Sequence, residues 1–207
     1  MSLIAALDYL SVFVFALTGA LAASRAQLDL VGFLFIASLT AVGGGTLRDM
    51  MLNRDLVFWV VDPWYIATAC LAAILVFFNA HRLESRRAAL DWLDAGALSV
   101  AVPAGVAVAW SLGHGPAVVL IMGMITGAMG GLMRDVVCNE VPLVLRQGEL
   151  YLSAAFAGAS SALIVLYFCE SQSLGLLACA VVTFLLRGGS LAFGWRLPVY
   201  KSRPPRA

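Results

Sequence analysis

The feature that most constrains the fold of this chain is a series of seven apolar segments with only short polar breaks between them. A transmembrane helix needs about 20 apolar residues, and only a helix satisfies its own backbone in lipid. The mean hydropathy is +0.94 and 12% of the residues are charged, against about a quarter in a soluble domain. We therefore expect an all-α membrane protein with seven transmembrane helices, over residues 3–24, 30–52, 63–80, 90–110, 116–138, 148–169 and 173–194.

The polar breaks are too short for a soluble domain, so we expect a single transmembrane domain over residues 1–207, with a cytoplasmic tail over 195–207. Lys and Arg favour the cytoplasmic loops of membrane proteins. With the N-terminus outside, the outer side receives Arg48 and Arg54, and the inner side receives Arg25, Arg82, Arg86, Arg87, Arg134, Arg146, Arg196, Lys201, Arg203 and Arg206. The prediction is a multi-pass protein of the cell inner membrane with an outside N-terminus and a cytoplasmic C-terminus.

An internal repeat relates the first three segments to the next three. The motif Gly44-Gly45-x-x-Arg48-Asp49 recurs 86 residues later as Gly130-Gly131-x-x-Arg134-Asp135, and Asn53 and Tyr65 match Asn139 and Tyr151 at the same offset. Leu7-Asp8-Tyr9-Leu10 resembles Leu90-Asp91-Trp92-Leu93, which would align Asp8 with Asp91 at the helix starts. Repeat one would cover 3–80 and repeat two 90–169, with the seventh helix at 173–194. Three spans per repeat make the second copy inverted, as in many transport proteins.

Glycines lie near the middle of the second span, at Gly43, Gly44 and Gly45. Each glycine in a helix interior costs about 1 kcal/mol relative to alanine, so three together favour a break or a sharp kink. Gly127, Gly130 and Gly131 would act likewise in the fifth span. The freed backbone groups must face protein or water, so we expect a cavity near the midplane whose carbonyls can replace the hydration shell of an ion. Close helix packing is the alternative.

Charges follow these glycines within the thickness of the membrane. Arg48 and Asp49 are sequence neighbours on different sides of a helix, so we expect partners elsewhere, such as Asp55, or a lipid phosphate for the arginine. Thr46 and Asp49 fit a capping box for a helix that restarts after the glycines. Arg187, in the seventh span, is expected to attach that helix to the bundle.

These motifs, together with Arg187 and the closing Gly194-Trp195-Arg196-Leu197-Pro198, resemble the bacterial branch of the trimeric intracellular cation (TRIC) channels, over nearly the whole chain. The resemblance implies a homotrimer with one potassium-permeable pore in each subunit, between the repeats. The ion path would then be lined by Thr18, Gly43, Gly44, Gly45, Thr46, Thr126, Gly127, Gly130 and Gly131. Arg48, Asp49, Arg134, Asp135 and Arg187 would hold or gate it.

A small-solute transporter for glycine-like amino acids is the alternative, because proteins of this kind have also been labelled putative glycine transporters. Helix carbonyls favour a cation, whereas the arginines favour an anion or a carboxylate, so the sign of the cargo rests on the resemblance. The sequence has no GxxxxGK loop and no nucleophile–base arrangement, so we expect no enzyme, no catalytic or metal-binding residue, and no cofactor beyond the permeant monovalent cation. Expected partners are the lipid bilayer, potassium ions and further copies of the chain, with no nucleic acid.

Overall fold

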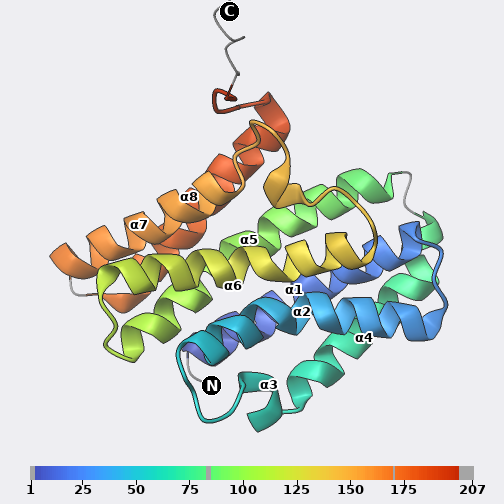
Figure 1. Cartoon of the computed structure of the whole chain (residues 1–207), viewed down its shortest axis with the longest axis horizontal. Coiled ribbons are helices and arrows are strands. Elements are labelled where there is room, and N and C mark those ends of the chain that lie inside the picture. The colour runs from blue at the N-terminus through green and yellow to red at the C-terminus, as the bar shows by residue number, and fades with distance from the viewer. Residues whose placement is uncertain (1–2, 83–84, 170, 201–207) are drawn as a thin grey trace, which may run out of the picture.

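The computed structural model describes residues 3–82, 85–169 and 171–200, and these are all-helical apart from one isolated β-bridge. Seven helices are long and apolar enough to cross a membrane, and they lie roughly along one direction (Figure 1). They are α1 (Leu3–Arg25), α2 (Leu30–Met51), α4 (Trp64–Asn79), α5 (Arg86–Ser111), α6 (Pro116–Val137), α7 (Leu152–Cys169) and α8 (Gln172–Phe193). The short helices are α3 (Phe58–Val61), η1 (Ala80–Arg82) and η2 (Leu143–Leu145). The predicted fold class is confirmed.

Helix boundaries follow local capping. α5 begins at Arg86, earlier than expected, because the Ser85 side chain accepts a hydrogen bond from the amide of Ala88. α7 begins at Leu152, later than expected, because Glu149 and Tyr151 belong to a turn before it. Asn53 and Asn139 have positive φ angles of 50° and 55°, a conformation that asparagine tolerates. The repeat therefore preserves the same left-handed turn after α2 and after α6.

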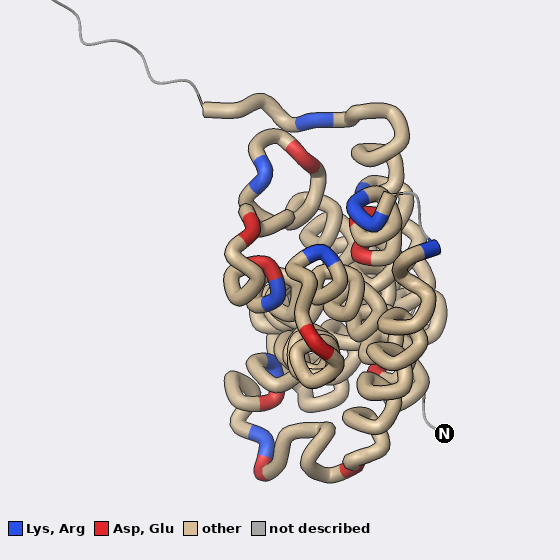
Figure 2. Tube along the Cα trace, turned by 90° about the vertical axis from the view of Figure 1, so that its right-hand side faces the viewer, with Lys and Arg blue, Asp and Glu red and all other residues tan. Residues whose placement is uncertain are grey.

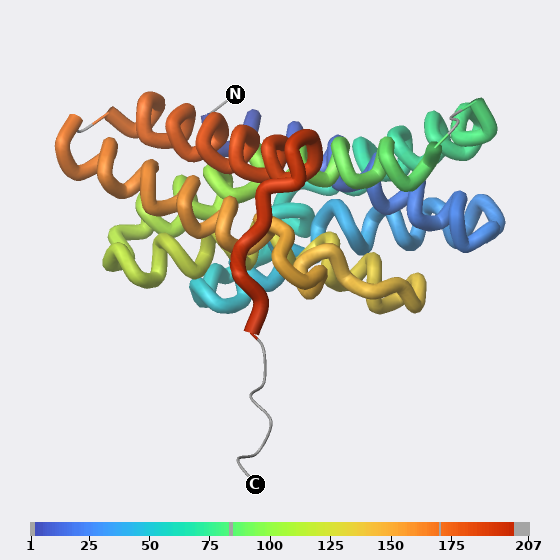
Figure 3. The backbone as a smooth tube through the Cα atoms, turned by 90° about the horizontal axis from the view of Figure 1, so that it is seen from above, coloured from blue at the N-terminus to red at the C-terminus, as the bar shows by residue number. Residues whose placement is uncertain are grey.

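The two repeats pack through a central set of helices. α5 is the most enclosed span and packs against α1, α6, α7 and α8. α1 packs against α2, α4 and α5, and α2 packs against α6 across the boundary between the repeats. Seen from above, α8 lies along α7 at one side of the bundle (Figure 3). The seventh helix is therefore attached to the second repeat and to its central helix.

The expected break at the glycines is wrong, because α2 and α6 are continuous helices through Gly43–Gly45 and Gly130–Gly131. The restart at Thr46 is also wrong. Its hydroxyl donates to the carbonyl of Val42 one turn earlier, as expected for a helix interior. A continuous helix keeps its own carbonyls satisfied, so none is freed at the midplane.

The chain after α8 turns back across the bundle (Figure 3). Gly194 ends the helix with a positive φ of 69°, and Arg196 then forms the isolated antiparallel bridge with Glu149. The amide of Leu197 donates to the carbonyl of Gly148 at 2.8 Å. The first part of the predicted tail is thus held against the turn before α7, whereas residues 201–207 lie outside the described residues.

Candidate functional site: the crossing of α2 and α6 and its buried ion pairs

The glycines of the two motifs let α2 and α6 touch backbone to backbone. A Cβ atom at Gly44 would overlap the carbonyl oxygen of Thr126, and one at Gly130 would overlap that of Thr40. These two contacts are related by the repeat, since 44 and 40 correspond to 130 and 126. Such approach between membrane helices is what small residues permit. Close packing, the alternative reading of the glycines, is therefore the arrangement that the structure has.

The other glycines that were predicted to line the ion path also pack against neighbouring groups. A Cβ at Gly43 would lie 2.8 Å from the sulfur of Met133, and one at Gly45 would lie 2.6 Å from the Phe58 ring. Gly127 faces Val102 and Leu98 of α5, and Gly131 faces Asp94, Tyr151 and Arg134. The structure thus brings the predicted glycines together around one helix crossing, with side chains of α3 and α5 packed beside it.

The threonines that were predicted to line the ion path donate hydrogen bonds to backbone carbonyls of their own helices. Thr18 donates to the carbonyl of Phe15 at 2.8 Å, and Thr126 donates to that of Met122 at 2.6 Å. Both side chains are buried. Thr46 additionally accepts a hydrogen bond from the indole Nε1 of Trp59 at 2.9 Å. In this conformation Thr46 therefore fastens the segment around α3 to α2.

Arg48 lies at the centre of an ion-pair network that includes its sequence neighbour. Its Nε donates to Asp49 Oδ1 at 2.8 Å, and its NH1 donates to Asp8 Oδ1 on α1 at 3.0 Å. Asp49 also accepts from Arg54 at 3.3 Å and, through Oδ2, from the amide of Phe58 at 2.8 Å. The network joins α1, α2 and α3.

Arg134 repeats this geometry in the second half. Its Nε donates to Asp135 Oδ1 at 2.8 Å and its NH1 donates to Asp94 Oδ1 at 3.0 Å. Asp135 Oδ2 accepts a hydrogen bond from the amide of Leu143 at 2.8 Å. This bond holds η2 in the same way as the bond from the amide of Phe58 to Asp49 holds α3. Tyr151 places its hydroxyl close to Asp94, on the side of Gly131.

Three expectations about these charges are corrected. Arg48 does pair with Asp49, because a long arginine side chain can fold back so that Nε meets the next carboxylate while NH1 reaches another helix. Asp55 is not its partner, and a lipid phosphate is excluded because the Arg48 side chain has 0% exposure. The equivalent of Asp8 in the second repeat is Asp94 and not Asp91. Asp8 and Asp94 both lie inside their helices and not at the helix starts. Asp94 satisfies the offset of 86 that relates the two motifs, and that signal was available in the sequence.

Arg187 anchors α8 to the turn before α7. Its NH1 donates to Glu149 Oε2 at 2.8 Å, and its guanidinium carbon lies 5.1 Å from the centre of the Tyr151 ring. Next to it on α8, Ser190 accepts from the amide of Leu150 and donates to the carbonyl of Trp195. Sequence reasoning missed Glu149, which carries no motif of its own, and recognised Tyr151 only as the repeat match of Tyr65.

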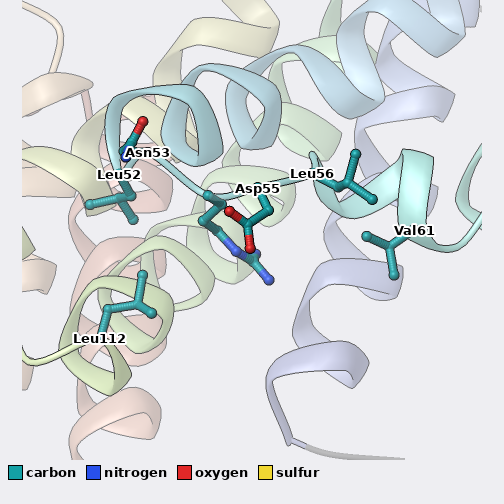
Figure 4. Close-up of a pocket in the computed structure, with 7 residues that line it drawn as sticks. Leu52, Asn53, Asp55, Leu56, Val61 and Leu112 are labelled. Atoms are coloured by element: carbon teal, nitrogen blue, oxygen red, sulfur yellow. The ribbon is translucent and has the colours of Figure 1, made fainter.

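The two ends of the bundle carry different polar features. Beyond α2 there is a groove of about 450 Å³, here called the Asp55 groove, into which Asp55 points (Figure 4). It is lined by Leu52, Asn53, Arg54, Asp55, Leu56, Val61 and Leu112. At the other end, Glu140 Oε2 pairs with Arg25 at 3.1 Å and with Arg87 at 2.8 Å, and we call these three residues the Glu140 cluster.

The two ion-pair networks balance the positive charges of Arg48 and Arg134. In each network the arginine contacts two carboxylates, so neither Arg48 nor Arg134 presents an unbalanced positive charge. Figure 2 shows acidic and basic positions next to each other within the bundle. The preference of these arginines for an anion or a carboxylate, expected from the sequence, is therefore met within the protein. No cluster of three His, Cys, Asp or Glu side chains suited to a metal ion occurs among the described residues.

Fold and site together define a class: a seven-helix membrane protein built from an inverted three-helix repeat, with one arginine-centred ion-pair network in each half. A family model described as Glycine transporter matches the chain twice, over residues 5–81 and 91–167, with the same offset as the repeat. The UPF0126 membrane protein of Vibrio cholerae is 37% identical over 202 residues, covering 96% of this chain and 83% of that protein.

Two further relatives agree with this match. The UPF0126 inner membrane protein YadS of Escherichia coli K12 is 36% identical over 198 residues, covering 94% of each chain. A crystal structure of the TRIC trimeric intracellular cation channel orthologue from Rhodobacter sphaeroides superposes with a TM-score of 0.90 at 38% identity, covering 94% of this chain and 100% of that one. The chain belongs to the bacterial TRIC channel family.

Proposed function

We propose that the protein is a potassium-permeable cation channel that works as a homotrimer, with a pore inside each subunit. The observation that carries this proposal is the close structural likeness to the Rhodobacter sphaeroides channel, whose description names a trimeric cation channel. The two networks are compatible with a cation, because Arg48 and Arg134 each contact two carboxylates, with Asp49 shared between Arg48 and Arg54. Potassium as the ion and the trimer as the assembly are part of the proposal.

We place the pore at the crossing of α2 and α6, where Thr18, Thr46, Thr126 and the two glycine groups lie. The support is geometric, because this crossing is the symmetric meeting point of the two repeats, and inverted-repeat transport proteins bind their cargo there. In this conformation the two backbones are in contact at Gly44 and Gly130. Conduction therefore requires α2 and α6 to separate, which opens a path between the glycine backbones without a side chain in the way.

The positive-inside rule predicts how the protein is oriented in the membrane. Seven spans place the two ends of the chain on opposite sides, and the cationic loops favour an outside N-terminus. The Glu140 cluster would then be cytoplasmic and the Asp55 groove would face outward. The name of the Escherichia coli relative supports an inner-membrane location. Labelling of single cysteines introduced at Asp55 and at Arg82 in intact cells tests this orientation, because only the first should react with an impermeant thiol reagent.

A carrier for glycine-like amino acids is the second candidate, and the description of the matching family model favours it. The two functions separate in one experiment on purified protein in liposomes and planar bilayers. A channel should give unitary potassium currents that persist without glycine. Saturable uptake of labelled glycine, with no unitary current, would contradict the channel and support the carrier. Cross-linking of the detergent-solubilised protein tests the trimer.

A further inference from the structure

The two ends of the bundle are related by the repeat, but they are closed to different extents. At the offset of 86, Glu140 corresponds to Arg54, and Arg25, the last residue of α1, corresponds to Ser111, the last residue of α5. Glu140 pairs with Arg25 at 3.1 Å and with Arg87 at 2.8 Å. These pairs tie the turn after α6 to the end of α1 and to the start of α5.

The equivalent place at the other end is open. There the Asp55 groove, of about 450 Å³, separates the turn after α2 from Leu112, the residue that follows α5. Arg54, which lines this groove, pairs with Asp49 at 3.3 Å. Among the described residues, no ion pair joins Arg54 to the end of α5.

The helix packing shows the same difference. α1 packs against α6, whereas the repeat-related pair, α5 and α2, makes at most marginal contact. The asymmetry is therefore a difference in how the helices of the two repeats approach each other. It does not depend on single side chains at the surface.

We propose that this structure is a channel conformation open at the Asp55 end and closed at the Glu140 end, where the Glu140 cluster forms a gate in addition to the closed crossing of α2 and α6. This inference rests on the proposed channel function. Opening would move the turn at residues 138–142 away from the end of α1, which creates the counterpart of the Asp55 groove. The Arg25, Arg87 and Glu140 side chains are 26%, 37% and 22% exposed, so their pairs are weak enough to break in a gating step.

Single-channel recording tests the gate with two variants of opposite charge change. Glu140→Gln and Arg87→Gln both break the 2.8 Å pair, so both should raise the open probability, by about twofold to fivefold. The double variant should open little more than Glu140→Gln alone, because the pair is already lost. Opposite effects of the two single variants would show that only surface charge matters and would overturn the proposal, as would no effect in either.

A second measurement does not depend on conduction. In a background without Cys70, Cys138, Cys169 and Cys179, the pair Ala26→Cys/Val141→Cys, which leaves the Glu140 cluster intact, is compared with its repeat-related control, Leu112→Cys/Asp55→Cys. A short bifunctional thiol reagent should join the first pair about tenfold faster than the control pair and should stop the current until it is reduced. Equal rates would overturn the asymmetry. Unequal rates in the two cysteine variants, together with no current from the wild-type protein, would contradict the channel function alone.

Discussion

Gly44 on α2 and the backbone carbonyl of Thr126 on α6 lie so close that no side chain fits between them. The repeat-related pair, Gly130 and the carbonyl of Thr40, has the same relationship. The two helices therefore meet at a point of internal symmetry, and their contact there is made by backbone atoms. Because backbone cannot move aside as a flexible side chain does, this crossing is sensitive to a single added methyl group.

Gly44→Ala should lower the free energy of unfolding by about 1–3 kcal/mol, because the new Cβ overlaps the Thr126 carbonyl and forces the helices apart. Denaturation of the purified protein in detergent measures this, and bilayer recording of the same variant should show altered conductance. Gly96→Ala is the matched control, since Gly96 is also inside a helix but has open space at its Cβ position. There the alanine should be neutral or should stabilise by up to about 1 kcal/mol. Equal losses at both sites would argue against the packing role.

Asp94→Asn should destabilise the protein by about 3 kcal/mol, because it removes one of the two carboxylates that neutralise the fully buried Arg134. Asp91→Asn is the control: its contacts with Arg87 and Arg146 are longer, at 3.5 and 3.6 Å, and partly exposed. That change should cost less than about 1 kcal/mol. Thermal unfolding in detergent measures the stability of both variants. A larger loss of stability for Asp91→Asn than for Asp94→Asn would contradict the assignment of Asp94 as the counterpart of Asp8.

Arg187→Gln should loosen the turn before α7, because Glu149 loses its 2.8 Å partner on α8. Hydrogen exchange at the amide of Leu150, which donates to Ser190, should become faster. Arg196→Gln serves as the control, since Arg196 takes part through its backbone and its side chain is exposed. Unchanged exchange in the Arg187 variant would show that α8 does not hold this turn.

Thr46→Val should cost about 1 kcal/mol, since the indole of Trp59 then loses its acceptor in a part-buried position. Thr68→Val removes a hydroxyl that bonds only the carbonyl of Trp64, four residues before it on α4, and should be nearly neutral. Melting temperatures of the two variants give the comparison. Equal melting temperatures would mean that the Trp59 bond contributes nothing to holding α3.

Several properties of this protein are determined by its sequence alone. The bilayer demands long apolar helices, so the seven spans are visible in the hydropathy, and their bounds differ from the structure by only a few residues at most ends. Residue identities at a constant offset reveal the repeat, and its odd number of spans makes it inverted. Asn53 and Asn139 belong to this signal, because both copies of the repeat need the same left-handed turn after the glycine-containing helix.

Other properties were decided only by the tertiary structure. A run of glycines suits a broken helix and a close helix contact equally well, and the outcome depends on whether another backbone lies against it, as Thr126 does against Gly44. The partners of Arg48 could not be predicted either. Helical periodicity shows which face of a helix a residue lies on, but it does not show which residue of another helix lies opposite that face. Asp8 reaches Arg48 from 40 residues away only because α1 packs on α2. The difference between the two ends is also tertiary, since the same repeat can hold its helices together at Glu140 and apart at Asp55.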